Sequence, residues 1–149
     1  MRTKLTLTLA DAKAIAAAAE EYAESQQLAV SIAIVDESTY LQHLRRMDGA
    51  PYLSADGAVE RARTAAEGGH PTTFFEEPLN AGRVSMLKMP VYPLEGGIPV
   101  FVDGLCVGGI GVAGVLPELD AAIAEAGLKA LDHTTSMAAP TAGAGVAAP

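Results

Sequence analysis

Residues 96–114, with the sequence GGIPVFVDGLCVGGIGVAG, carry the strongest structural signal in the chain. Two apolar segments flank Asp103 and Gly104, and an Asp-Gly pair readily supplies the positive φ angles of a two-residue hairpin turn. The flanking positions hold branched apolar side chains, which suit a half-buried sheet surface: Ile98, Val100, Val102, Leu105 and Val107. We therefore predict an antiparallel hairpin that the rest of the chain covers or extends.

Three other segments have the apolar periodicity of helices. They are residues 8–27, residues 57–67 and the segment that begins at Pro117. Thr8 and Asp11 have the spacing of a capping box, and either Ser54 or Asp56 is the predicted N-cap of the second helix. The glycine pair at 68–69 is the predicted end of that helix.

The remaining segments are shorter or less regular. Residues 30–35 and 40–47 predict two strands joined by a turn, and alternation places Leu41, His43 and Arg45 on one face of the second strand. Residues 72–77 predict a short helix that Pro78 ends. Residues 79–94 predict a loop or edge strand that lines a cleft. Hairpins separated by helices favour an α+β fold with an antiparallel sheet.

Length and composition predict one domain. The chain has 149 residues, which we divide into a folded domain at 1–132 and a low-complexity tail at 133–149. The tail has too little apolar bulk to order itself.

Charge and cysteine content indicate which partners are excluded and which compartment is expected. A net charge of −8 argues against nucleic acid or an anionic membrane surface as partner. No apolar run reaches the roughly 20 residues that span a bilayer, and the N-terminus lacks the pattern of a secretory signal. The single cysteine, Cys106, fits a reducing compartment, so we predict a cytoplasmic location.

Residues 109–114, GIGVAG, match the glycine spacing of a dinucleotide-binding loop. That motif requires a following strand, and none is predicted here. Glu118 and Asp120 also lie where a helix would have to receive a pyrophosphate. We interpret these glycines as positions of close backbone approach.

Few residues point to chemistry. His43, His70 and His133 are too scattered for a metal-site signature, so we predict no metal site; His70 is the histidine best placed to enter a pocket. Cys106 lies in an apolar predicted strand, so we expect its thiol to stay neutral. The guanidinium group of arginine can donate two hydrogen bonds to one carboxylate, so Arg46 and Arg61 are candidates to bind a carboxylated ligand. We expect the side chains of Met86 and Met89 to fill gaps in the core, with contact to a flat apolar ligand as the alternative.

Four blocks resemble the GlcG/HbpS-like family, whose members bind or degrade haem. They are LTLADAKAIAAAA at 7–19, VSIAIVD followed by RMDGAP at 30–51, AVERARTAA at 58–66, and EGGIPV followed by GLCVGGIGVAG at 95–114. The resemblance covers residues 5–131. It implies a profilin-like, three-layer α/β/α fold with a central antiparallel sheet, and homo-oligomers as large as octamers.

Two functional hypotheses follow from the resemblance. The first is a protein that binds haem, or a related flat carboxylated ligand, in a pocket at or near a subunit interface. Its site residues would be His43 or His70 on iron and Arg46 or Arg61 on a carboxylate, beside Gly96 and Gly97. The second is a cofactor-independent isomerase, lyase or cyclase that acts on an acidic metabolite, with His43, Glu60 or His70 as general acid or base.

Overall fold

The computed structural model describes residues 1–131 and 135–136. The helices are α1 (Leu9–Ser25), α2 (Ser54–Gly68), α3 (Thr73–Asn80) and α4 (Pro117–Leu128), with a 3₁₀ helix, η1 (Val84–Lys88). The strands are β1 (Ser31–Asp36), β2 (Leu41–Arg46), β3 (Gly97–Val102), β4 (Leu105–Ala113) and β5 (Thr135–Ser136). Among these residues, no helix is long and apolar enough to cross a bilayer.

The predicted hairpin is confirmed and lies inside an antiparallel sheet of order β2-β1-β4-β3-β5. Asp103 and Gly104 have φ angles of 52° and 77°, which is the conformation a tight two-residue turn requires. The register places Ile98 opposite Ile110. The turn between β3 and β4 therefore sets the centre of the sheet.

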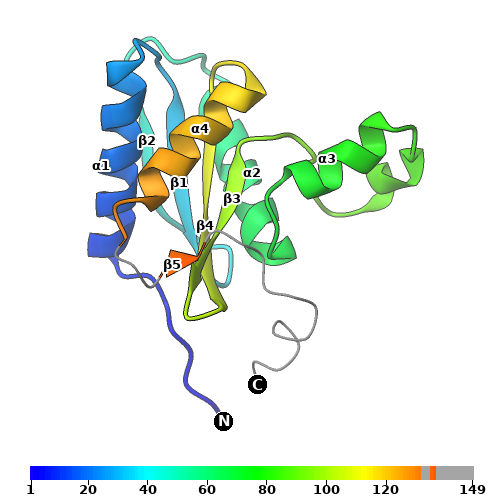
Figure 1. Ribbon diagram of the computed structural model, residues 1–149, viewed down its shortest axis with the longest axis horizontal. Coiled ribbons are helices and arrows are strands. Elements are labelled where there is room, and N and C mark those ends of the chain that lie inside the picture. The colour runs from blue at the N-terminus through cyan, green and yellow to red at the C-terminus, as the bar shows by residue number, and fades with distance from the viewer. Residues whose placement is uncertain (132–134, 137–149) are drawn as a thin grey trace.

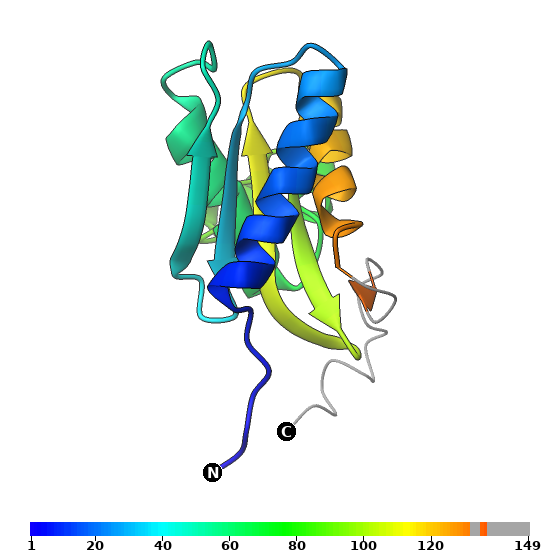
Figure 2. The same cartoon turned by 90° about the vertical axis from the view of Figure 1, so that its left-hand side faces the viewer.

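Helices cover both faces of this sheet, which confirms the predicted α+β, three-layer arrangement. Figure 2 shows α1 and α4 on one side and α2 on the other. Ile32 and Ile34 of β1 pack into the core under α1 and α4, whereas Ala33 and Val35 pack against α2. The alternation of these four buried residues follows from the two-residue period of a strand.

The glycines of β4 let α2 lie directly on the sheet. A Cβ atom at Gly111 would collide with the Ala58 carbonyl oxygen, and one at Gly109 would collide with the Ala62 carbonyl oxygen. The interpretation of the 109–114 glycines as positions of close approach is therefore confirmed.

The helix ends are partly as predicted. Thr8 and Asp11 form the capping box of α1, and Gly69 (φ 65°) closes α2 in the left-handed conformation. The predicted N-cap of α2 is wrong. Leu53 occupies that position without a side-chain bond, because Ser54 is buried and its hydroxyl lies 2.7 Å from the Ser31 hydroxyl.

Pro78 does not end α3 as predicted, since the helix continues to Asn80. Proline removes only one backbone donor. The helix closes two residues later, with the Ala81 amide on the Glu77 carbonyl oxygen and the Arg83 amide on the Pro78 carbonyl oxygen. The loss of one bond near the end of a short helix is therefore tolerated.

The prediction that Leu41 and His43 share a face of β2 is wrong. Ile34 pairs with His43, but Val35 pairs with Leu41, so the register shifts between them. A bulge of this kind moves a side chain to the other face. Leu41 therefore joins Leu44 on the α2 side, while His43 stays on the α1 side.

Residues 70–96 form an arm that leaves the layered body beyond β3. Figure 1 shows α3 and the following turn standing to one side of the sheet. The stretch predicted as a loop or edge strand contains η1. Of the predicted tail, residues 135–136 form β5 beside β3; residues 133, 134 and 137–149 lie outside the described residues.

Candidate functional site

The arm contains a groove of about 800 Å³ between α3 and η1. That volume lies within the range of roughly 300–1,000 Å³ typical of cofactor and small-molecule sites. Its walls are mostly apolar, with two aromatic rings and two thioethers: Phe74, Phe75, Pro78, Ala81, Met86 and Met89. Glu77, Arg83 and Ser85 are its polar lining residues.

The 3₁₀ helix η1 and the residues on either side of it present one cationic and two sulfur-bearing side chains to the groove. In a 3₁₀ helix, residues three apart are eclipsed, and Arg83, Met86 and Met89 all line the groove. Val84 and Leu87 are not among the lining residues and are 69% and 68% exposed. The prediction that the two methionines pack in the core is wrong, since Met86 is only half-buried and Met89 is 42% exposed.

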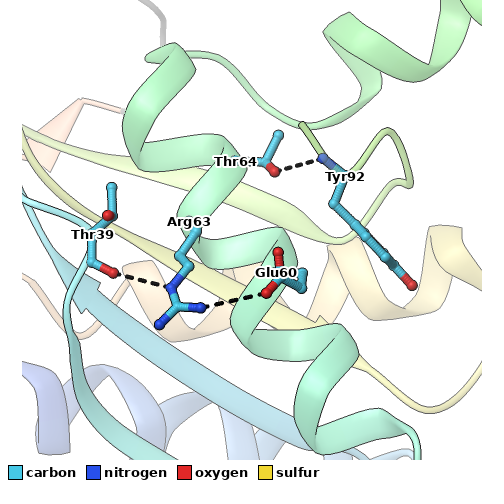
Figure 3. Close-up of polar contacts among 5 residues, drawn as sticks. All are labelled: Thr39, Glu60, Arg63, Thr64 and Tyr92. Carbon is cyan, nitrogen blue, oxygen red and sulfur yellow. Dashed lines mark hydrogen bonds and ion pairs between the residues drawn. The ribbon is translucent and has the colours of Figure 1, made fainter. Parts of the chain in front are cut away.

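Hydrogen bonds hold the arm against the body. The Thr72 amide donates to the Gly97 carbonyl oxygen and the Gly97 amide donates to the Thr72 hydroxyl, both at 3.0 Å. The Tyr92 amide donates to the Thr64 hydroxyl of α2 at 2.8 Å (Figure 3). The two ends of the arm are thus fixed to β3 and α2.

Carboxylates gather where the arm returns to the sheet. The Glu95 amide donates to a Glu76 carboxylate oxygen at 2.8 Å. Burial, and then the neighbouring Glu76 charge, raise the pKa of the Glu95 carboxyl. This end of the arm is therefore unfavourable for a further negative charge, which leaves Arg83 as the groove residue suited to an anion.

Arg61 lies in the interior and does not line the groove. It is 7% exposed, its Nε donates to the Glu95 carbonyl oxygen at 3.0 Å, and its guanidinium lies 5.4 Å from the centre of the Tyr92 ring. These contacts connect α2 to the returning end of the arm. Its predicted contact with a ligand carboxylate stays a prediction.

Gly96 and Gly97 lie beside Arg61. A Cβ atom at Gly96 would come within 3.0 Å of the Arg61 side chain, and one at Gly97 would collide with the Arg61 carbonyl oxygen. The structure therefore brings three of the predicted ligand-binding residues together, as a close contact between α2 and β3.

The two described histidines lie on different parts of the molecule. His70 stacks on Phe74, with ring centres 4.0 Å apart and planes 8° apart, so it supports one wall of the groove. His43 accepts a hydrogen bond from Arg45 at 3.0 Å on the α1 side of the sheet. Burial, followed by the Arg45 charge, lowers the pKa of His43. His133 lies outside the described residues.

The other predicted residues are also separate. Glu60 pairs with Arg63 at 3.4 Å on the outer face of α2 (Figure 3). Arg46 is exposed on the outer strand β2, 5.8 Å from the Tyr52 ring, and lines a different hollow of about 500 Å³. The candidate acid and base residues His43, Glu60 and His70 therefore do not form one constellation.

Cys106 is half-buried, and its thiol contacts the carbonyl oxygens of Ala66 and Gly108. Burial raises the pKa of this thiol, in line with the predicted neutral state. Within residues 1–131 and 135–136, no three His, Cys, Asp or Glu side chains are arranged to hold a metal ion.

Sequence reasoning did not select Phe74 or Arg83. The signal that it missed is the three-residue spacing of Arg83, Met86 and Met89, which predicts a common face only if the segment is helical. Nothing in the local sequence distinguishes that helix from an irregular loop.

Comparison with known proteins gives consistent matches over almost all of the domain. The model of the family described as "Haem degrading protein HbpS-like" matches residues 7–129. Protein GlcG of Escherichia coli (strain K12) is 42% identical over 114 residues, which cover 76% of this chain and 85% of that protein.

Solved structures agree with these matches. A double mutant of Streptomyces reticuli HbpS has a TM-score of 0.83 at 37% identity, covering 89% of this chain and 92% of that one. The complex of PduOC with haem has a TM-score of 0.80 at 27% identity, covering 89% of this chain and 99% of that one.

Proposed function

This chain belongs to the HbpS-like family, and we propose that it binds haem, or a related flat carboxylated ligand, in the groove between α3 and η1. The observation that carries the proposal is the groove itself: about 800 Å³ with aromatic and thioether walls and one arginine. The PduOC complex, a similar structure that contains haem, supports the choice of ligand.

The groove residues fit such a ligand. Phe74, Met86 and Met89 offer apolar contacts to a flat ring system, and sulfur and aromatic groups pack well against one another. The Arg83 guanidinium offers paired donors for a carboxylate. If the ligand is haem, it would bring an iron atom at the centre of its flat ring. The residues of this chain would bind and orient it.

We include self-association in the proposal, with the ligand held at or near a subunit interface. Large apolar side chains are exposed in two places. One is strand β2 with the residues just before β2 and just before α2, and the other is η1 next to the groove: Tyr40, Leu41, Leu44, Tyr52 and Leu53, with Val84 and Leu87. Apolar patches of this kind commonly mark protein interfaces. A closed ring such as an octamer would cover both surfaces. The single cysteine supports a cytoplasmic location.

Titration of the full chain with haemin tests the ligand and the site. We expect a saturable Soret band, and we expect Arg83→Gln to weaken binding roughly 10- to 100-fold, because a charge-assisted hydrogen bond contributes roughly 1.5–3 kcal/mol. Arg46→Gln is the matched control, since it removes the same charge at β2.

Two outcomes would contradict this proposal. One is saturation by haemin without any shift of its absorbance. The other is loss of affinity in Arg46→Gln with none in Arg83→Gln, which would move the carboxylate contact to the hollow beside Tyr52.

A further inference from the structure

Four side chains that line the groove have atoms able to coordinate iron: Glu77, Ser85, Met86 and Met89. His70 is not among the lining residues, because its ring lies flat against Phe74 at 4.0 Å. The other described imidazole, His43, lies on the α1 side of the sheet and accepts a hydrogen bond from Arg45. The donors that face the groove are therefore sulfur and oxygen atoms.

Exposure separates Met86 from the other three. Glu77, Ser85 and Met89 are all exposed, while Met86 is half-buried. An exposed carboxylate or hydroxyl keeps its water, and taking it into an apolar contact costs free energy. A thioether has almost no hydration to lose. Desolvation therefore favours the two thioethers, and of these Met86 is half-buried while Met89 is 42% exposed, so the Met86 sulfur is the one less open to competing water.

The position of Met86 on η1 also fits. Arg83, which immediately precedes η1, and Met86 are three residues apart and line the same groove. An arginine that holds a peripheral carboxylate would leave Met86 as the next lining residue toward the interior of the ring. The Met89 amide donates to the Met86 carbonyl oxygen at 3.1 Å, which fixes the backbone of this turn.

We propose that the iron of haem bound in the groove is ligated by the thioether sulfur of Met86; this inference rests on the proposed function. A thioether is a soft, neutral ligand that favours ferrous over ferric iron and raises the reduction potential. Ligation by Glu77 would have the opposite effect. The site is then one that holds reduced haem more tightly than oxidised haem.

The test compares Met86→Leu with Met89→Leu in the full chain loaded with haemin, since both changes conserve volume. We expect the loaded wild type to show a sulfur-to-iron charge-transfer band. Met86→Leu should lose that band and have a lower midpoint potential in a potentiometric titration. Met89→Leu should keep the band and the potential, and both variants should match the wild type by circular dichroism.

Several outcomes would overturn the inference. A band retained in Met86→Leu excludes Met86, and an imidazole signature that disappears in His70→Ala assigns the iron to the histidine. If haemin binds and Arg83→Gln weakens it, but the wild type shows no sulfur band, this inference fails while the proposed function stands. If haemin does not bind saturably, both fail.

Discussion

Asp120 is a fully buried carboxyl group at the start of α4. One of its oxygens accepts a hydrogen bond from the Val115 amide at 3.2 Å, while Oδ2 has no hydrogen-bond partner among the described residues. Burial raises the pKa of Asp120 to about 7, although the Val115 amide and the Arg61 charge act in the opposite direction. An unpartnered buried charge costs free energy, so this residue makes stability depend on pH.

The sign of that dependence follows from the raised pKa. The folded state keeps its proton up to about pH 7, while the unfolded chain loses it from about pH 4, so the free energy of unfolding falls as pH rises between these values. We expect Asp120→Asn to exceed the wild type in stability at pH 8 by a few kcal/mol, at about 1.4 kcal/mol per pKa unit. The difference should shrink toward zero at pH 4.

Urea unfolding of both proteins across this pH range measures the effect. The asparagine keeps an oxygen for the Val115 amide. A constant difference at all pH values would show that Asp120 does not titrate differently in the two states.

At the scale of elements, strand β4 and the turn before it show two uses of glycine. Gly111 has no room for a side chain because the backbone of α2 lies against it, whereas Gly104 has open space but a φ of +77°. The first use is steric and involves two elements. The second is conformational and stays within one turn.

This difference can be measured with two alanine substitutions. We expect Gly104→Ala to cost about 1–2 kcal/mol, the penalty of a left-handed conformation. Gly111→Ala should cost about 3 kcal/mol or more, because α2 has to move away from the sheet. Chemical denaturation of each variant gives the comparison. Equal losses would mean that α2 adapts at little cost.

At the scale of the whole molecule, exposed apolar surface remains on the β2 side and on the arm. Leu44 is 38% exposed on β2 and Leu87 is 68% exposed on η1. Burying such side chains between copies gains about 25 cal/mol per Å² of apolar surface. The proposed assembly would use these two surfaces.

Sedimentation velocity tests that assembly. We expect the wild type to sediment as an oligomer, and Leu44→Lys and Leu87→Lys to shift it toward smaller species because each buries a charge at the interface. Leu9→Lys, at the exposed start of α1, is the control and should leave the mass unchanged. A monomeric wild type, or an equal shift in all three variants, would contradict the proposal.

Much of the layered fold could be predicted because its signals are local. Asp103 and Gly104 specify a turn within two residues, and Thr8 and Asp11 specify a helix start within four. Gly109 and Gly111 predict close backbone approach because they lack side chains, and α2 lies directly against them. The cytoplasmic location stays a prediction.

Other features depend on contacts between distant segments, and only the tertiary structure decided them. Ser54 does not cap α2 because its hydroxyl meets the Ser31 hydroxyl of β1, and Leu41 changes face because β1 pairs with β2 through a bulge. Arg61 is interior because the returning arm closes over it. Met86 lines a groove because η1 folds back on α3. Each outcome is set by which partner arrives from elsewhere in the chain, and the residue's own sequence neighbours carry no record of that partner.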